Sequence, residues 1–245
     1  SAIPVFFRRL FTRTLEKTVR HADDGGVYVI TGDIPAMWLR DSSCQFEPYF
    51  ALAAKDERIA ALIAGLVKRQ IQCILHDPYA NAFNETANGK HWAEDKTEMS
   101  DWIWERKYEI DSLCYPLRLA YKLWKTTGST EHFTQDFHQA VKRILAVWQV
   151  EQDHENRSPY RFERDGCYFT DTLSRNGKGA LVNSGIGLLW SGFRPSDDAC
   201  VYGYLIPSNM FACVVLGYVN EIASAVLHDD ALAAEASAMQ QTIRT

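Results

Sequence analysis

The sequence lacks the motifs that mark several common classes of enzyme. It contains no His-Glu-x-x-His zinc motif, no phosphate-binding P-loop, no Gly-x-Ser-x-Gly nucleophile elbow and no Gly-x-Gly-x-x-Gly dinucleotide fingerprint. Its six cysteines are scattered, and none forms the Cys-x-x-Cys pair that is typical of zinc and redox sites. We therefore expect neither a metal ion nor an organic cofactor.

The sequence also lacks a surplus of positive charge and any long apolar run. Lys and Arg total 26 against 31 Asp and Glu, a formal net charge of -5, which argues against a nucleic-acid partner. No apolar run reaches the roughly 18 residues of a membrane-spanning helix, so no membrane partner is expected. No secretory signal pattern is visible, and the unpaired pattern of cysteines favours a cytoplasmic location. The chain begins at Ser1, which leaves a removed leader or a truncated start open.

What the sequence does contain is helical periodicity. Apolar residues recur at helical spacing in two segments above all, 56–76 and 130–152. The helix predicted at 207–228 is apolar nearly all round, so we expect it to be buried on several sides. Inner apolar helices alternating with outer amphipathic ones predict an all-α toroid of helical hairpins. The full set of predicted helices is 2–20, 41–54, 56–76, 109–127, 130–152, 207–228 and 229–245.

Three irregular stretches separate these helices, at 21–40, 77–108 and 153–206. They hold most of the Gly, Asn, Asp, Trp and Pro, and long loops on a helical scaffold usually carry the function. Short strands are expected at 26–31 and 160–169, as hairpins. A complete toroid of six hairpins needs twelve helices, and about seven are predicted here. We therefore expect residues 1–245 to be a single catalytic domain whose C-terminal part is missing.

The first motif lies just before the helix at 41–54. Trp38 offers a flat apolar face to a sugar ring, and Arg40 and Asp41 can hold hydroxyl groups as donor and acceptor. The alternative is structural: Arg40 and Asp41 form an ion pair, and Asp41 caps the helix.

The second motif mixes charges with aromatic residues over 101–112, a composition that fits a polar cleft. Its candidate sugar ligands are Glu105, Lys107, Glu109 and Asp111, and His91 is a further candidate upstream. The alternative is the beginning of a surface helix that Asp111 caps. We expect these residues and those of the first motif to converge on one pocket together with Arg194.

The third motif places two adjacent carboxylates, Asp197 and Asp198, in a loop after Arg194 and Pro195. A glycosidase needs one carboxylic acid to protonate the leaving oxygen and a second carboxylate to activate water or attack the sugar. Adjacent residues tend to point in different directions, so these two are not expected to form that pair. The alternative is a capped loop with an internal salt bridge.

These segments occur in the order in which glycoside hydrolase family 125 carries them, and the chain resembles that family over its whole length. The matching segments are TGDIPAMWLRDS at 31–42, GLVKRQ at 65–70, DPYANAFN at 77–84, WIWERKYEIDSLCYPL at 102–117, VEQDH at 150–154, FRPSDDAC at 193–200 and YLIPSNMFA at 204–212.

The resemblance implies an (α/α)6 barrel and an exo-acting α-mannosidase that prefers α-1,6 linkages and inverts the anomeric centre without a metal. It implies a mannose-containing oligosaccharide as the partner, an Asp general acid and a Glu general base. The acid maps onto Asp198, with Asp197 as the alternate, and Ser208 and Asn209 belong to a further matching segment as substrate ligands. The base lies in the C-terminal third of the family's sequence, to which nothing here matches. We expect Asp198 to have a raised pKa, and Arg194 to pair with Asp197 or hold sugar.

Two other functions stay open on the residues alone. One is a non-catalytic sugar-binding toroid, because an acid without a base has no inverting mechanism. The other is an inverting phosphorylase or an epimerase on a similar fold. A phosphorylase needs a compact basic site, whereas each candidate Arg and Lys here stands beside an acid.

Overall fold

The computed structural model describes residues 3–168 and 170–244 and is mainly helical. The helices are α1 (Ile3–Thr18), α2 (Leu39–Phe46), α3 (Phe50–Ala53), α4 (Glu57–His76), α5 (Ile110–Thr127), α6 (Gln135–Glu151), α7 (His154–Arg157), α8 (Ser174–Gly177), α9 (Ile206–Ile222) and α10 (Asp230–Arg244). A 3-10 turn, η1 (Glu47–Tyr49), precedes α3, and a π-helical turn, η2 (Ala223–Leu227), continues α9. The strands are β1 (Val19–His21), β2 (Val27–Val29), β3 (Met37–Trp38), β4 (Ala82–Phe83) and β5 (Ile103–Glu105).

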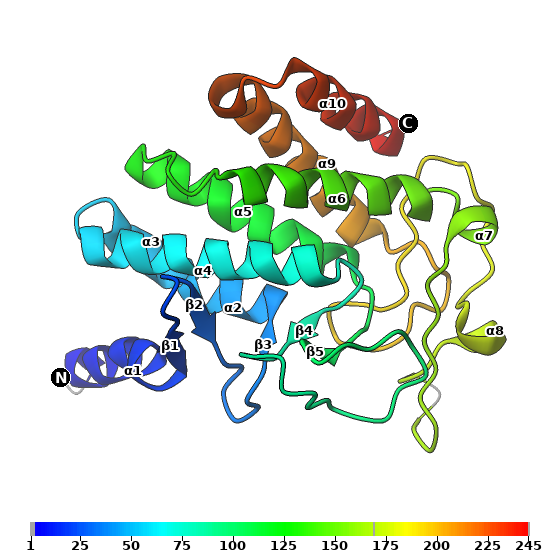
Figure 1. The fold of residues 1–245 in the computed structure, drawn as a ribbon, viewed down its shortest axis with the longest axis horizontal. Coiled ribbons are helices and arrows are strands. Elements are labelled where there is room, and N and C mark those ends of the chain that lie inside the picture. Colours follow the sequence, from blue (N-terminus) through cyan, green and yellow to red (C-terminus); the bar gives the residue numbers. More distant parts are fainter. Residues whose placement is uncertain (1–2, 169, 245) are drawn as a thin grey trace.

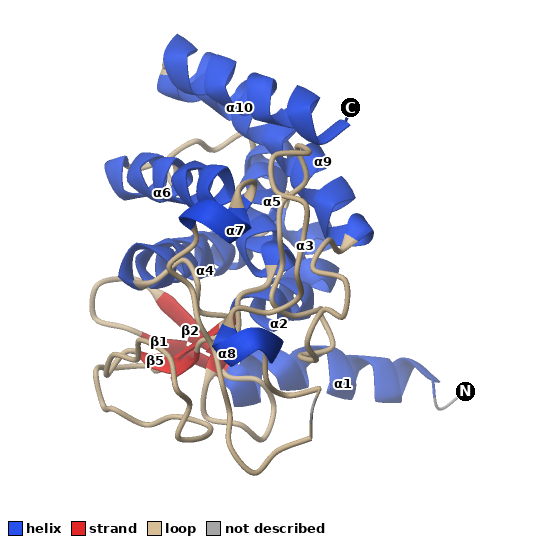
Figure 2. Ribbon diagram, turned by 90° about the vertical axis from the view of Figure 1, so that its right-hand side faces the viewer, coloured by secondary structure: helices blue, strands red, loops and turns tan. Residues whose placement is uncertain are grey.

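The long helices form two neighbouring rows, as the alternation of apolar and amphipathic segments predicts. In one row α5 packs between α2 and α9, and in the other α4 packs against α6. Helix α10 returns along α9. Figure 1 shows the resulting stack, with the long connections that carry α7 and α8 gathered at one end of it. Figure 2 shows the strands below α4 and α6, at the same level as α1 and α8. Consecutive helical hairpins of this kind are the predicted α/α architecture.

The predicted core face of the helix at 130–152 is confirmed. Phe137, Val141, Ile144 and Trp148 of α6 are all at most 1% exposed. They repeat every three or four residues, so they lie on one face of the helix and pack toward the core.

Local signals at the helix ends also behave as expected. Gly128 ends α5 in the left-handed conformation, with φ 76°, where the absence of a Cβ removes the steric penalty. Pro207 lies in the first turn of α9, where its missing N–H has no partner to lose. Thr134 accepts a hydrogen bond from the Phe137 N–H and so begins α6. The helix predicted from residue 130 therefore begins five residues later.

The predicted helix at 41–54 is interrupted. It consists of α2, η1 and α3, and Pro48 lies in the first turn of η1. Because proline has no N–H to donate and clashes with the preceding turn, it breaks the regular helical ladder.

The strands agree with the predictions only in part. The hairpin predicted around 26–31 is confirmed, since β2 pairs antiparallel with β1 in the register Val19 to Val29. The strand predicted at 160–169 is wrong over its described residues, which contain a single bridge between Glu163 and Lys96; position 169 lies outside the described residues. The sheet β3-β4-β5 was not predicted. Its strands of two or three residues are too short for an alternating pattern to show.

Two apolar helical faces are more exposed than predicted. On α9, Met210 and Val214 are 66% and 49% exposed, so that helix is not covered on every side. On α1, Phe7 and Leu10 are also exposed. By length and composition α4 and the α9–η2 segment could cross a membrane, but both pack within the helical rows as the core helices of globular proteins do.

Candidate active site

The small sheet brings the beginnings of two neighbouring helices together. Strand β3 runs directly into α2, and β5 leads through residues 106–109 into α5. Asn81 joins the two: its carbonyl accepts from the Leu39 N–H at 3.1 Å, and its side-chain oxygen accepts from the Lys107 N–H at 3.0 Å. The first and second sequence motifs therefore lie side by side, although about 65 residues separate them along the chain.

Arg40 forms the centre of a cluster of carboxylates. Its guanidinium donates to Glu109 Oε2 at 2.8 Å and lies 3.5 Å from Asp41, 3.6 Å from Asp111 and 3.7 Å from Asp197. We call these five residues the Arg40 cluster. Four acids around one base leave more negative charge than Arg40 can neutralise, so the cluster is an acceptor-rich site.

Many oxygens of the Arg40 cluster have no hydrogen-bond donor among the described residues. These buried atoms are Asp41 Oδ2, Glu109 Oε1, both side-chain oxygens of Asp111, and Asp197 Oδ1. Buried polar atoms in native proteins are nearly always hydrogen-bonded, and an unsatisfied group costs about 1–3 kcal/mol. Three of these five oxygens, Asp41 Oδ2, Asp111 Oδ2 and Asp197 Oδ1, face Arg40 at 3.5–3.7 Å, beyond hydrogen-bond distance. The group therefore has room for a ligand that brings several donors.

Burial and crowding shift the pKa values in this cluster. Burial raises the pKa of Glu109 well above its ordinary value; Arg40 opposes this, and Asp111 and Asp197 add to it. Burial likewise raises the pKa of Asp111 against the opposing charge of Arg40. For Arg40, burial acts to lower the pKa, but the surrounding carboxylates, Glu109 first, outweigh it and raise the pKa. The buried acids therefore hold protons to higher pH than exposed ones do.

A cavity of about 240 Å³ adjoins the cluster at Asp197. It is lined by three apolar side chains, Ile34, Trp38 and Trp92, and five charged ones, Glu105, Lys107, Arg164, Asp171 and Asp197. Trp38 is only 6% exposed, so its indole is embedded in the cavity wall. Trp92 is 54% exposed, so much of its indole is open to solvent. Flat aromatic faces beside fixed polar groups are a frequent lining of small-molecule sites.

Glu105 is fixed in this wall by its neighbours. Arg164 donates to its Oε1 at 2.8 Å, and Asn81 donates to its Oε2 at 3.1 Å. Arg164 is in turn held by two hydrogen bonds to Asp95, at 2.6 and 2.8 Å. The bidentate Arg164–Asp95 pair is a rigid anchor, and it makes Glu105 a fixed part of the rim.

The two adjacent aspartates of the third motif are held in opposite ways. Asp198 accepts a hydrogen bond from Arg194 Nε at 3.0 Å. It also accepts hydrogen bonds from Arg194 Nη2 and from the Ser196 hydroxyl. Partial burial acts to raise the pKa of Asp198, but those hydrogen bonds lower it below its ordinary value. Arg194 therefore pairs with Asp198 and not with Asp197, and the expected rise in the Asp198 pKa is wrong. The alternative that Arg194 holds sugar stays a prediction. Asp197 instead lines the cavity and faces Arg40.

Most of the predicted site residues meet, and five lie apart from the Arg40 cluster and the cavity: Asp198, Arg194, His91, Ser208 and Asn209. The Arg194 guanidinium donates to Asp198. His91 hydrogen-bonds Gly89 and Glu94 in an exposed loop. Asn209 donates to the Leu189 carbonyl and accepts from the Leu189 N–H, so it fixes the connection that leads to α9. Ser208 beside it is 3% exposed.

Sequence reasoning missed several residues that build the cavity. Arg164, Asp171 and Asp95 belong to no charged or aromatic motif, and Arg164 lies in a segment that the sequence predicts as a strand. The only signal for them was their place in the irregular stretches. Ile34 lies within the segment 31–42 but was not among the candidate site residues. Trp92 follows the candidate His91 in the sequence, and it lines the cavity although His91 does not.

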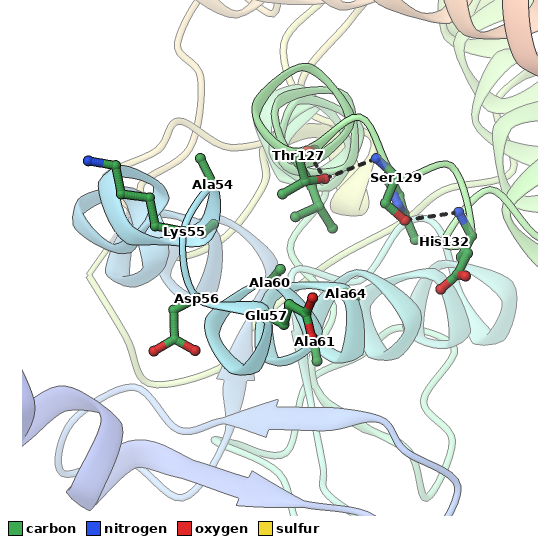
Figure 3. A pocket seen from close by; sticks show the side chains of 13 residues that line it. Ala54, Lys55, Asp56, Glu57, Ala60, Ala61, Ala64, Thr127, Ser129 and His132 are labelled. Atoms are coloured by element: carbon green, nitrogen blue, oxygen red, sulfur yellow. Dashed lines mark hydrogen bonds between the residues drawn. The ribbon is translucent and has the colours of Figure 1, made fainter.

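A larger cavity lies elsewhere and has a different character. It has a volume of about 650 Å³ and lies between α4 and the end of α5, as Figure 3 shows. Its wall includes Ala60, Ala61 and Ala64, and its polar groups serve local structure: Asp56 begins α4, and Thr127 accepts from the Ser129 N–H. We therefore place the candidate site at the Arg40 cluster.

Across residues 3–168 and 170–244, no three His, Cys, Asp or Glu side chains are grouped so that they could hold a metal ion. All six cysteines fall within that part of the chain, and each is a free thiol.

Comparison with known proteins decides the family. The model of the metal-independent α-mannosidases, GH125, matches residues 2–245. The chain belongs to this family.

Two relatives show how much of a family member is present. The Meiotically up-regulated gene 157 protein of Schizosaccharomyces pombe is 37% identical over 91% of this chain and 48% of its own length. A metal-independent α-mannosidase of Streptococcus pneumoniae, solved in a non-productive complex with α-1,6-mannobiose, is 54% identical. It superposes with a TM-score of 0.94 over 97% of this chain and 56% of its own. The chain thus spans about half the length of these relatives, and its α/α hairpins match those of a GH125 toroid.

Proposed function

We propose that the full-length GH125 protein is an exo-acting hydrolase that releases terminal α-1,6-linked mannose with inversion of the anomeric centre. One observation supports this most: five buried carboxylate oxygens without donors surround Arg40 beside an indole-lined cavity. A pyranose has several hydroxyl groups, which can donate to the carboxylate oxygens, and an apolar ring face, which can stack on an indole.

The α-1,6 linkage is the finer part of the proposal. The Streptococcus pneumoniae relative is described as a complex with α-1,6-mannobiose and in connection with the processing of N-linked glycans. A mannose-containing oligosaccharide is accordingly the substrate we propose for this protein.

Asp197 is the better candidate for the general acid. A general acid must reach the leaving oxygen with a proton. Both oxygens of Asp198 are engaged by Arg194 and Ser196, whereas Asp197 Oδ1 has no hydrogen-bond partner among the described residues and its side chain lines the cavity. We therefore exchange the roles expected from the motif and assign Asp198 to holding the loop.

An inverting enzyme also needs a carboxylate base about 6.5–9.5 Å from the acid, with space for water between them. The family's base is a glutamate in the part of the sequence that has no match here. We propose that this base belongs to the part of the relatives' length that the chain does not cover.

The test uses the full-length protein and α-1,6-mannobiose, with proton NMR to follow the first product. We expect β-mannose to form first and to mutarotate later. Early α-mannose would overturn inversion, and binding of mannobiose without any release of mannose would favour the non-catalytic sugar-binding alternative. The cytoplasmic location and the single catalytic domain stay predictions.

A further inference from the structure

We infer that Lys107 is a positioning residue, which holds the loop of Asp197 in the orientation that catalysis needs, rather than a ligand of the sugar. This inference rests on the proposed function, because it assigns Lys107 to the proton-transfer step of that reaction.

The ammonium group of Lys107 is turned toward protein acceptors. Its Nζ donates to the Asp197 backbone carbonyl at 2.6 Å and lies 3.5 Å from Asp171 Oδ1 and 3.7 Å from Glu105 Oε1. The side chain is only 3% exposed, and its Nζ stands 5.2 Å from the centre of the Phe193 ring. An ammonium group has three donors, and three protein oxygens surround this one.

The backbone of Asp197 needs such a support. Its φ is 65°, in the left-handed region, which a residue with a Cβ adopts less readily than glycine does. Its N–H donates to the Arg194 carbonyl at 2.9 Å and so closes a tight turn. The direction of the Asp197 side chain follows from this unusual backbone conformation, so whatever stabilises the conformation also aims the carboxyl group.

Two tethers attach the loop at 193–199 to the segment before α5. The Phe193 N–H donates to the Tyr108 carbonyl at 3.0 Å and fixes the base of the loop. Lys107 fixes its tip through the Asp197 carbonyl. Because Glu109 follows two residues later and bonds Arg40, this short segment connects the acid loop with the acceptor cluster.

Without the Lys107 tether, Asp197 can relax toward the ordinary right-handed region, and its carboxyl group then leaves the position of the leaving oxygen. A misplaced acid slows a reaction only where protonation of the leaving group matters. Two substrates of the full-length protein separate the cases: α-1,6-mannobiose, whose sugar leaving group needs a proton, and 2,4-dinitrophenyl α-mannoside, whose leaving group departs without one.

For Lys107→Met we expect kcat on mannobiose to fall about 10–100-fold, part of the usual effect of a positioned acid, with KM within about threefold of wild type. On the aryl mannoside we expect less than about a threefold loss. The methionine keeps most of the packing against Phe193, and Glu105 keeps its bonds to Arg164 and Asn81. Lys107→Arg keeps a donor near the Asp197 carbonyl and should recover part of the mannobiose turnover.

The matched control is Lys96→Met, which removes a lysine that is 61% exposed and paired with Asp165 in a neighbouring loop; neither substrate should be affected. Equal loss on both substrates, or a raised KM with kcat retained, would overturn the positioning role. If Lys107→Met does not fold, Lys107→Arg is measured instead. A loss of kcat that is larger on mannobiose than on the aryl mannoside supports the positioning role, and an equal loss on both contradicts it. If wild type releases no mannose from either substrate, the proposed function itself fails and this role falls with it.

Discussion

Two groups of buried acids lie near the loop end of the helices, and they differ in how their oxygens are satisfied. At the end of α6, Glu151 accepts from the Tyr79 hydroxyl at 2.7 Å, the Ser158 hydroxyl at 2.6 Å and His154 Nδ1 at 2.6 Å. In the Arg40 cluster, five carboxylate oxygens have no donor among the described residues. Glu151, Glu109 and Asp111 are all buried residues, so burial alone does not distinguish the two groups.

The difference separates a structural group from a binding group. Three side chains donate to Glu151, and His154 stacks on Trp190 with ring centroids 3.6 Å apart, so the group fixes the connection between α6 and α9. A fully satisfied buried network rigidifies a fold, whereas a partly satisfied one is held at a cost in stability. The Arg40 cluster carries that cost because, in our proposal, the missing donors are sugar hydroxyls.

The largest expected effect concerns the acid next to the Arg40 cluster. In the full-length protein, Asp197→Asn should lower kcat on α-1,6-mannobiose about 10²–10⁴-fold, the usual effect of losing a general acid. The loss on 2,4-dinitrophenyl α-mannoside should be much smaller. Asp198→Asn keeps the Asp197 carboxyl group and should cost less on mannobiose. The opposite ranking of the two variants would return the acid role to Asp198.

The second-largest effect is expected at Glu151, whose oxygens all accept hydrogen bonds. Glu151→Gln replaces one carboxylate oxygen by an amide NH2 group. That NH2 group then faces the hydrogen-bond donors of Tyr79, Ser158 or His154, so one buried donor is left without an acceptor. We expect the free energy of unfolding to fall by about 2 kcal/mol or more, as for other buried groups left without a partner. Denaturant melts of the full-length protein measure it. A change below about 0.5 kcal/mol would show that the Glu151 network is not structural.

The matched substitution in the Arg40 cluster is Asp111→Asn. It removes one of four carboxylates around Arg40, and the Asp111 side chain has only a long contact with Arg40, 3.6 Å from Oδ2. We expect unchanged or increased stability, with KM for mannobiose raised about tenfold, in the range for a hydrogen bond to a charged group. Stability that falls as in Glu151→Gln would remove the distinction between the two groups.

The sequence predicted the helices well because their apolar periodicity extends over many residues. The face of α6 and the ends at Gly128 and Pro207 follow from signals that act within one or two turns. The convergence of Arg40, Glu109 and Asp111 was also predictable, since the loops that join helical hairpins meet at one end of the stack.

The roles of Asp197 and Asp198 could not be predicted, because a single left-handed backbone angle at Asp197 decides which side chain meets Arg194. Arg164 was missed since its function arises only when Asp95 and Glu105, about 60–70 residues away in the sequence, fold against it. Asn209 was expected to bind sugar on the strength of its motif. Its side-chain amide instead forms two hydrogen bonds with the backbone of Leu189. Because Leu189 is 20 residues away in the sequence, this pairing arises only when the chain folds.

The smallest effect concerns pH, and it sharpens the difference between a buried acid and an exposed one. The pKa of Glu109 is raised in the folded protein, first by burial, so the native state keeps this proton to higher pH than the unfolded chain does. Between the ordinary value of 4.5 and the raised pKa, the native state binds more protons. Its stability therefore falls as pH rises through that interval.

Glu109→Gln cannot ionise, and its amide oxygen still accepts from Arg40 and Ser112. We expect the free energy of unfolding of Glu109→Gln, minus that of wild type, to become more positive as pH rises from about 4 to about 8. Glu98→Gln is the control, since Glu98 is 91% exposed and the same difference should stay flat. Denaturant melts at several pH values measure both. A difference for Glu109→Gln that is flat or falls with pH would mean that Arg40 stabilises the Glu109 carboxylate fully, and the Arg40 cluster would then resemble the satisfied Glu151 network.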